Sequence, residues 1–417
     1  MRTRPRTTND PSHPTKPASG PPDGARLTQV DALRGFALFG ILMVNITYMA
    51  SAYHGTGLED PGLDGPVSTA VRWVVTVFFE TKFFLLFSFL FGYSFTLQLD
   101  SAERRGVRFT PRFLRRLTGL FVIGAAHAVF LFPGDILTLY AVLGLVLLAL
   151  HRIKPATAVR VAVVTLAVTA VAYMLLALAV AQSGGDGTIP ESVAASAAQT
   201  TEDLRGAPAS VIAANLRQLP DVAFLLIFFQ APSALAAFLL GLAAGRRKAF
   251  TALDQRFLRR LQWTGFTIGL TGGIVYGHAT LNHPEPAYQV VALGLDVITA
   301  PLLAAAYAAT VLRAFEGRHS RTLVRALAPA GRMSLTNYLG QSLICALLFT
   351  GFGAALIGRV APLGVAAIAI TLFTAQTVTS RWWLRHHAYG PLEWLLRAWT
   401  ALAIPPWRPP QPANHRP

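Results

Sequence analysis

Cysteine and charged residues are scarce in this chain of 417 residues. The single cysteine, Cys345, can form neither an intrachain disulfide nor a cysteine metal cluster, and its place inside an apolar run indicates a small core residue. The ten histidines show no paired ligand spacing such as HExxH, so we expect no bound metal. Only 13% of the residues are charged, against about 25% in an ordinary soluble domain, which indicates that lipid surrounds much of the protein.

Acidic residues are the scarcer of the two signs, with 20 Asp and Glu against 36 Lys and Arg and a formal net charge of +16. In a soluble protein such an excess would suggest nucleic-acid binding. Here the basic residues stand in connections that alternate with long apolar runs, which is typical of cytoplasmic loops in membrane proteins. We therefore expect a lipid bilayer as partner and no nucleic acid.

Ten long apolar runs fill the chain, and runs of about 18 or more residues with few charges are typical of membrane-spanning helices. The predicted fold class is an all-α polytopic transmembrane helix bundle of about ten spans. The spans are expected at 31–50, 76–99, 113–132, 135–151, 157–182, 221–245, 262–280, 288–312, 331–351 and 361–380.

Basic connections alternate with nearly uncharged or acidic ones along all ten runs, which places both termini in the cytoplasm of a multi-pass plasma-membrane protein. Residues 1–27 are expected to form a disordered basic cytoplasmic tail, since they lack an apolar run. Residues 28–404 are expected to form a single transmembrane helical domain. A disordered Pro-rich tail is expected at 405–417.

Three stretches fit no ordinary span. Residues 66–80 are expected to be an amphipathic or partly re-entrant approach to the second span on the outer side. The polar stretch 183–220 is interpreted as a loop too short for a separate domain. The Trp-rich stretch 391–403 predicts an interfacial helix on the cytoplasmic face.

The first span carries an acid, an arginine and an amide, which an apolar helix does not need for stability. Asp31 and Arg34 are three residues apart, so they can pair with each other and set the depth of the helix, or form a cationic site for phosphate at the cytoplasmic mouth. Asn45 lies eleven residues after Arg34, about 16 Å along the same helix face.

Four further ionisable residues are expected near the outer end of the bundle. His127 and Asp135, on either side of the turn at Pro133, could act as a base and its orienting partner. Alternatively, His127 bonds a neighbouring helix and Asp135 caps the next one. Glu80 and Lys82 are expected near the same mouth, where Lys82 could also extend to the interface.

The ninth span opens with several hydrogen-bonding residues. Asn337 and Gln341 are typical of side chains that bridge helices, which is the favoured interpretation, and they could also line a polar cavity. Arg332 stands at the cytoplasmic mouth, as Arg34 does, so the two arginines could flank one anionic group.

These residues belong to segments that resemble the YeiB-like family, also called domain of unknown function 418. The matching segments are DALRGFALFGILMVNI at 31–46, KFFLLFSFLFG at 82–92, His127 with PGDIL at 133–137 and Tyr140, GRMSLTNYLGQS at 331–342, and SRWW at 380–383 with YGPLEW at 389–394. The resemblance covers nearly the whole chain after residue 27, and it adds Tyr140 to the residues expected around a polar cavity.

The first span is more distantly similar to that of transmembrane acyltransferases, including the lysosomal heparan-glucosaminide acetyltransferase and the acyltransferase-three group. In the latter group an Arg and a His on the first span are separated by ten residues. Arg34 keeps the Arg position here, whereas Asn45 stands in place of the His. His127 or His54 would then supply the imidazole, and the membrane position of His127 favours it.

Two functions follow from these residues. In the first, an integral membrane acyltransferase moves an acyl group from cytoplasmic acyl-CoA, a co-substrate rather than a permanent cofactor, to a hydroxyl or amine of a small-molecule or glycan acceptor at the outer side. In the second, a membrane transporter moves a small anionic or polar solute along the same polar path. No inverted repeat is evident, which favours the enzyme. A structural or signalling protein is the third alternative, and the oligomeric state stays open.

Overall fold

The structure is a computed structural model that describes residues 23–183, 191–250, 254–283, 285–315, 317 and 320–408. The described part is helical, without strands. Residues 1–22 and 409–417, which include most of the two predicted tails, lie outside the described residues. The predicted all-α class is confirmed.

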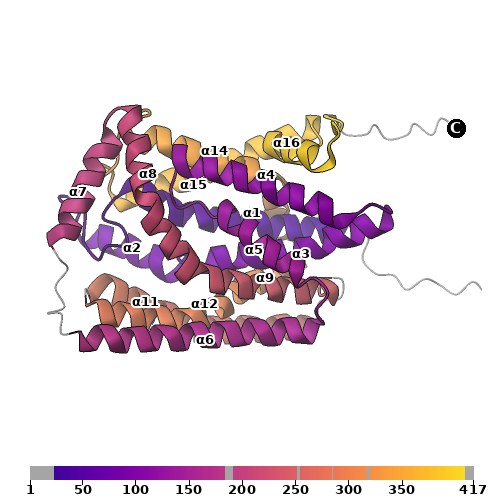
Figure 1. Cartoon of the computed structure of the whole chain (residues 1–417), viewed down its shortest axis with the longest axis horizontal. Helices are drawn as coiled ribbons and strands as arrows, with labels where there is room; N and C mark the ends of the chain where they lie inside the picture. Colours follow the sequence, from indigo (N-terminus) through magenta and orange to yellow (C-terminus); the bar gives the residue numbers. More distant parts are fainter. Residues whose placement is uncertain are drawn as a thin grey trace, which may run out of the picture.

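The helices follow one another with short connections (Figure 1). They are α1 (Asp23–Ala50), α2 (Pro66–Phe78), α3 (Lys82–Arg104), α4 (Phe109–Phe130), α5 (Leu137–Ala149), α6 (Pro155–Gln182), α7 (Glu191–Arg205), α8 (Pro208–Leu225), the π-helical turn η1 (Leu226–Gln230), α9 (Ala231–Arg246), α10 (Gln255–Thr264), the π-helical turn η2 (Gly265–Gly269), α11 (Leu270–Asn282), α12 (Pro286–Ala314), α13 (Ser320–Arg332), α14 (Ser334–Phe349), α15 (Pro362–His386) and α16 (Pro391–Ala401).

Proline marks where many of these helices begin. It is the first residue of α2, α6, α8, α12, α15 and α16. The first turn of a helix has no intrahelical acceptor for its N–H groups, so the missing proline N–H costs nothing there and the fixed φ favours the helix. The chain therefore encodes several helix starts locally.

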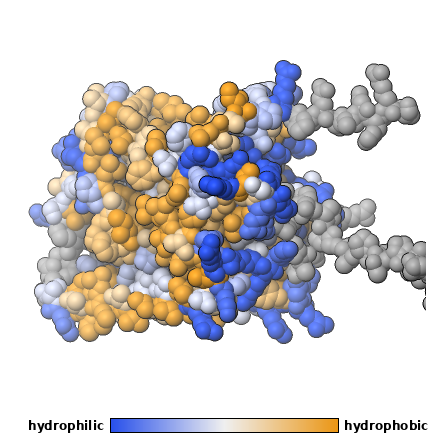
Figure 2. All heavy atoms as spheres, turned by 45° about the vertical axis from the view of Figure 1, so that its right-hand side comes forward, coloured by the Kyte–Doolittle hydropathy of each residue, from blue (hydrophilic) through white to orange (hydrophobic). Residues whose placement is uncertain are grey.

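Most residues of every predicted span are helical, and seven helical segments of the described chain are long and apolar enough to cross a bilayer. Two further apolar helices, Leu137–Ala149 and Ser334–Phe349, are shorter. The hydrophilic residues gather at the end of the molecule where the C-terminal segment leaves, while hydrophobic residues cover most of the remaining visible face (Figure 2). The protein thus has the features of a membrane protein, and the count of ten spans stays a prediction.

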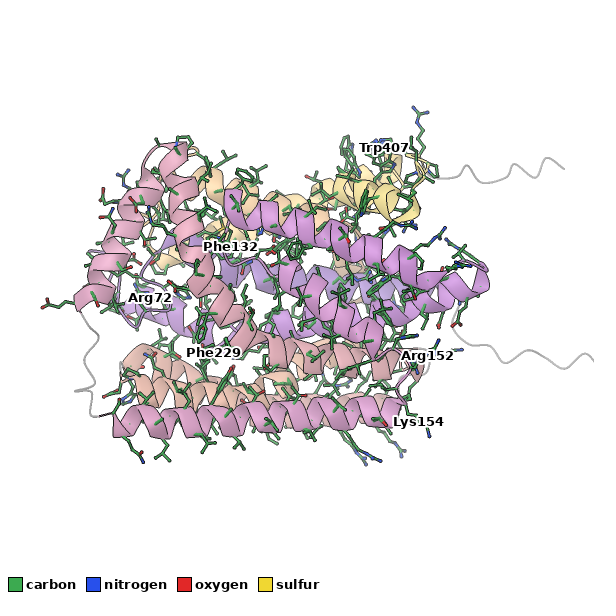
Figure 3. The ribbon with its side chains drawn as sticks, in the orientation of Figure 1. Arg72, Phe132, Arg152, Lys154, Phe229 and Trp407 are labelled. Atoms are coloured by element: carbon green, nitrogen blue, oxygen red, sulfur yellow. The ribbon has the colours of Figure 1, made fainter. Side chains whose placement is uncertain are left out.

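The two ends of the bundle differ along its long axis. Arg152 and Lys154 lie at the end from which the C-terminus leaves, and Arg72 lies at the opposite end (Figure 3). Helices α6, α11 and α12 lie along one side, and α4, α14, α15 and α16 along the other, with α1, α3 and α5 between them (Figure 1). In the predicted orientation, the end with Arg152 faces the cytoplasm.

The interpretation of 183–220 as a loop is wrong for most of its length. Helix α7 fills Glu191–Arg205, and α8 begins at Pro208 and continues through η1 into α9 as one bent segment that ends at Arg246. The alanine-rich composition of α7 favours a helix even without membrane burial. Pro220 lies inside α8, and η1 follows it, which explains the bend.

The second predicted span is broken rather than continuous. Helix α2 ends at Phe78 and α3 begins at Lys82, and Thr81 between them has a φ of +64°, a conformation that β-branched residues rarely adopt. The break lies deeper than the expected outer mouth. The Phe83 ring fills the space beside Gly40, near the middle of α1, so Glu80 and Lys82 lie well inside the bundle. Non-helical backbone at this depth is tolerated because protein surrounds it.

Helix α13 packs closely on α1 at Gly331, where an added Cβ atom would lie 1.7 Å from the Asp31 carbonyl oxygen. We expect Gly331→Ala to destabilise the fold by about 1–3 kcal/mol through overpacking. A lowered midpoint of thermal unfolding in detergent would measure this. The matched control is Gly340→Ala, whose Cβ would meet its nearest neighbour at an ordinary 3.5 Å. Equal unfolding midpoints for both variants would contradict the prediction.

Candidate functional site

His127 and Asp135 form a buried pair at the junction of α4 and α5. The His127 Nδ1 atom lies 2.9 Å from Asp135 Oδ1, and both side chains are almost wholly buried. The second carboxylate oxygen of Asp135 accepts a hydrogen bond from the backbone N–H of Thr138 at 2.8 Å. Gly124 leaves room for that oxygen, because a Cβ there would lie 2.5 Å from it. Asp135 therefore has two roles: one carboxylate oxygen orients the imidazole, and the other caps the start of α5.

The other imidazole nitrogen, His127 Nε2, is buried and has no hydrogen-bond partner among the described residues. A carboxylate on Nδ1 favours the tautomer with the proton on that nitrogen, which leaves Nε2 as an acceptor. The Tyr338 ring of α14 lies beside the imidazole, with ring centroids 5.1 Å apart. A buried acceptor nitrogen held by a carboxylate has the geometry of a general base.

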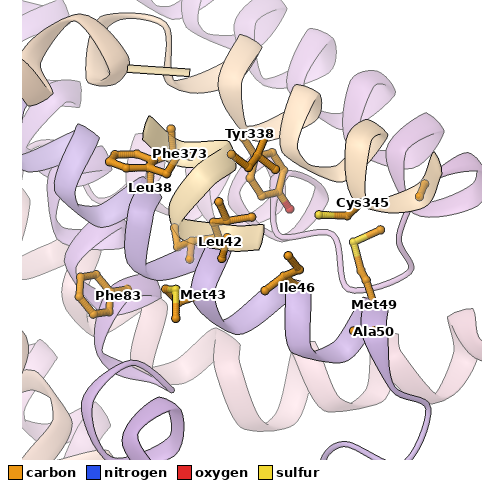
Figure 4. Close-up of a cluster of buried hydrophobic side chains, with 14 of the residues drawn as sticks. Leu38, Leu42, Met43, Ile46, Met49, Ala50, Phe83, Tyr338, Cys345 and Phe373 are labelled. Atoms are coloured by element: carbon orange, nitrogen blue, oxygen red, sulfur yellow. The ribbon is translucent and has the colours of Figure 1, made fainter. Parts of the chain in front are cut away.

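Tyr338 begins a stripe of α14 in which sequence reasoning had named Gln341 alone as a candidate site residue. Gln341, Ser342 and Cys345 follow it at spacings of three, four and seven residues, so they share one helix face. These three side chains line a small cavity of about 10 Å³ together with Asn45 of α1. Figure 4 shows Tyr338 and Cys345 on the same side of α14, toward the Leu42–Met49 part of α1. Asn45 forms no hydrogen bond with the described residues in the structure.

Asn337, Gln341 and Tyr140 bridge helices, as expected for the first two, and Gln341 also lines the small cavity. The Asn337 amide donates to Ser380 Oγ at 2.9 Å, and the Gln341 amide donates to Gln376 Oε1 at 2.8 Å, which ties α14 to α15. The Tyr140 hydroxyl lies 2.6 Å from Ser88 Oγ and thereby links α5 to α3.

The two best-formed cavities of the described residues do not include the charged residues of the predicted site. Neither of the two cavities described for residues 23–408 is lined by Arg34, His127 or Asp135. Leu42, Ile46 and Met49 of α1 and Cys345 of α14 surround the small cavity at Asn45. The predicted site residues thus fall in three places: the cationic end of the bundle around Arg34, which faces the cytoplasm in the predicted orientation and is called the inner end, the small cavity at Asn45 (the polar pocket), and the buried His127–Asp135 pair (the dyad).

The inner end holds the predicted pair of Asp31 and Arg34, whose charged atoms are 2.7 Å apart. Arg34 also donates to Ser94 of α3, so its charge is largely used within the protein. Arg332 is exposed and lies within electrostatic range of Asp31. The expectation that Arg34 and Arg332 share one end of the bundle agrees with this arrangement.

Arg116 of α4 is a further cation at this end. Its Nε atom is buried, and it forms no hydrogen bond or ion pair with the described residues. It lies within electrostatic range of Arg34, Arg397 and the Glu393 carboxyl, and Arg397 stacks on the Tyr389 ring at 4.3 Å. In the sequence, Arg116 belongs to a run of arginines at 104–116, which was used only to predict the orientation of the spans. A cation that has no hydrogen-bonded partner within the described part of the protein is available for an external anion.

Helix α16, which matches the helix expected at 391–403, supports this end. Glu393 accepts hydrogen bonds from the backbone N–H groups of Leu335 and Thr336, at 2.7 and 3.1 Å, and from the Thr336 hydroxyl. These donors are the free amides at the start of α14, so Glu393 caps that helix from a distance. Burial raises the pKa of the Glu393 carboxyl, while the hydrogen bonds favour its charged form.

A second polar centre surrounds the break between α2 and α3. Lys82 Nζ lies 3.2 Å from Asp296 Oδ1 and 5.2 Å from the centre of the Tyr276 ring. Lys82 is fully buried and Asp296 is 2% exposed. Sequence reasoning missed Asp296, although it is the single charged residue in the predicted span 288–312.

Glu80 joins the same centre to the connection after α1. Its carboxylate lies 3.1 Å from His54 Nε2, 3.3 Å from the Thr76 hydroxyl and 3.4 Å from the Tyr276 hydroxyl. His54, the alternative imidazole, is therefore paired with Glu80 and separate from Asp135. The described residues include no group of three or more His, Cys, Asp and Glu side chains placed to hold a metal.

Comparisons with known proteins place the chain among bacterial relatives of similar length. It is 32% identical over 401 residues to the uncharacterized protein YxaH of Bacillus subtilis (strain 168), covering 92% of this chain and 96% of the relative. It is 30% identical over 402 residues to the uncharacterized protein YeiB of Escherichia coli (strain K12), covering 91% and 98%. Residues 244–403 match the family described as "Protein of unknown function (DUF418)". No solved structure matches the chain.

The Lys82–Asp296 pair yields a test of how buried charge is tolerated. We expect Lys82→Met to destabilise the fold by about 3–5 kcal/mol, because it leaves Asp296 charged and unpaired. The double variant Lys82→Met/Asp296→Leu should recover most of that loss, since neither charge remains. Thermal unfolding in detergent measures all three proteins. If the double variant is no more stable than Lys82→Met, the pair does not compensate its own burial.

Proposed function

This chain belongs to the YeiB-like DUF418 family, and we propose that it is an integral membrane acyltransferase of the plasma membrane that uses cytoplasmic acyl-CoA. The observation that carries the proposal is the buried His127–Asp135 pair with an unbonded Nε2 atom. Apolar helices gain nothing from such a pair, and a half-satisfied imidazole costs free energy in a membrane interior. Proton transfer during acyl transfer gives that nitrogen a partner.

In the proposed reaction, His127 Nε2 accepts the proton of an acceptor hydroxyl or amine as the acceptor oxygen or nitrogen attacks the thioester carbonyl carbon. The carbon–sulfur bond breaks, and the proton passes to the leaving thiolate, so that the products are the acylated acceptor and CoA. Asp135 stabilises the imidazolium that forms in between. The acceptor, a small molecule or a glycan, arrives from the outer side.

Asn45 is the proposed donor to the thioester oxygen as negative charge develops there. Its amide has no internal partner, and Ser342 lies across the same cavity. The cavity is too small for a thioester in this conformation, so α14 has to move relative to α1 when the substrate binds. The stripe that begins at Tyr338 connects this cavity to the dyad along a single helix face.

The phosphates of acyl-CoA are proposed to bind at the inner end, on Arg116 with Arg34 and Arg332. Guanidinium groups suit phosphate because they donate paired hydrogen bonds in a fixed plane. Arg116 is the strongest of the three candidates, since Asp31 and Ser94 already engage Arg34.

Loss of the base tests the reaction directly. We expect His127→Ala to lower acyl transfer from labelled acyl-CoA in native membranes by about 10²–10⁴-fold, which is the usual contribution of a general base. His386→Ala, an exposed histidine on α15, is the matched control and should keep full activity. Full acceptor labelling by folded His127→Ala protein would falsify the assignment.

The phosphate site predicts a selective change in substrate binding. Arg116→Ala should raise the KM for acyl-CoA by about 10–100-fold, the equivalent of one hydrogen bond to a charged group, and leave the KM for acyl-pantetheine unchanged, because that thioester lacks the phosphates. Arg116→Lys should recover part of the loss. Parallel increases in KM for both thioesters would instead indicate a general defect in packing.

A membrane transporter of a small anionic or polar solute is the second candidate, and the centre at the α2–α3 break favours it. Discontinuous helices with buried charges near mid-depth are common at transporter binding sites. Uptake into proteoliposomes separates the two functions. Accumulation of unmodified solute, lost in Lys82→Met/Asp296→Leu but kept in His127→Ala, would replace the enzyme with a transporter.

A further inference from the structure

An apolar groove of about 520 Å³ opens on the surface between α1, α2 and α15. Seven of its eleven lining residues come from the segment between Pro66 and Phe79, and all eleven are apolar. Phe39 and Met43 of α1 and Ala366 and Ile370 of α15 form the remaining walls. The groove is separate from the dyad, from the polar pocket and from the inner arginines.

The groove extends along the whole of α2. From Pro66 to Phe79 it covers about 20 Å at the rise of an α-helix, slightly more than the ~15 Å depth of the hydrocarbon in one leaflet. Aromatic rings close the groove at the α2–α3 break. There, the ring centroids of Phe39 and Phe79 are 5.9 Å apart, and Phe79 stacks on Phe83. Because Phe83 packs beside Gly40, that end lies near the middle of α1.

The groove cannot remain empty in a bilayer. Water is excluded, since the walls offer it no hydrogen-bonding side chain, and an empty apolar space forfeits van der Waals contacts along its walls. The neighbouring molecules are lipids. At about 30 Å³ per water-sized group, a volume of 520 Å³ accommodates a chain on the order of seventeen methylene groups.

We infer that this groove is a binding site for one acyl chain of a phospholipid from the leaflet beside the 51–65 connection, the outer leaflet in the predicted orientation. The chain enters near Pro66 and ends against Phe79. A bound acyl chain stabilises the α2–α3 break, because it fills the space on the side of α2 that faces away from Thr76 and Glu80. This site is independent of the proposed acyl transfer.

The test uses the full chain in liposomes that contain phosphatidylglycerol with a diazirine at a defined carbon of one acyl chain. A diazirine near the chain end should crosslink to Met43 or Phe79, and one near the glycerol to Pro66 or Val67, as mapped by mass spectrometry. The exposed α6 residues Val164 and Val168 report ordinary surrounding lipid in the same sample.

Filling the groove should remove its lipid selectively. We expect Ala366→Phe to lower crosslinking to α2 at least tenfold and to leave crosslinking to α6 unchanged. Ala367→Phe, the next residue of α15 and outside the groove, is the matched control and should keep both. If Ala366→Phe does not fold, Ala70→Phe fills the groove from α2.

Two results would overturn the inference. One is equal crosslinking of α2 in a folded groove-filling variant and in Ala367→Phe. The other is a reversed order, with chain-end crosslinks near Pro66, which would mean that the chain enters from the opposite leaflet. Acyltransferase activity has no part in either readout, so this site and the proposed reaction can fail separately.

Discussion

The low dielectric between the helices requires partners for buried ionisable groups, and much of the arrangement depends on this constraint. An unpaired charge in such a place costs several kcal/mol, so chain segments distant in sequence are brought together by charge matching. Lys82 pairs with Asp296, 214 residues away in the sequence, and His127 pairs with Asp135 across the short connection between α4 and α5. The α2–α3 break persists at depth because Glu80 and Lys82, on either side of Thr81, both find partners there.

Helix α14 connects the separate parts of the candidate site. Glu393 of α16 caps its first turn, Asn337 and Gln341 hold it to α15, and Tyr338 contacts His127. A ligand at the inner end and a change at the dyad would therefore act on the same rigid element. Polar bonds to one neighbour and apolar packing on another let such a helix shift against α1 while staying attached to α15.

The two imidazole–carboxylate pairs have different surroundings and so different uses. His127 is enclosed and oriented, with a free nitrogen, which suits proton transfer within a water-excluding site. The His54 side chain is 15% exposed and binds Glu80 through Nε2, next to a buried lysine and a second acid. The surroundings of the His127–Asp135 pair favour proton transfer, whereas those of the His54–Glu80 pair favour a structural or ion-linked role.

Much of the helical framework could be read locally. Apolar runs, prolines at helix starts and the spacing of Asp31 from Arg34 predicted the all-helical fold, the positions of the runs and that ion pair correctly. The His127–Asp135 pair was also predicted, as one of two alternatives, because only a short turn separates the two residues. The helix α7 was missed because a polar, alanine-rich segment lacks the apolar signature of a span.

What only the tertiary structure decided is which groups meet across helices. The sequence by itself determined that Lys82, Glu80, Asp296, His54 and Arg116 stand in or beside apolar runs. It could not determine that four of them gather at one helix break while Arg116 stays unpaired at the inner end. Helix order along the chain does not specify helix neighbours in space, and neighbours alone decide which buried charges compensate one another.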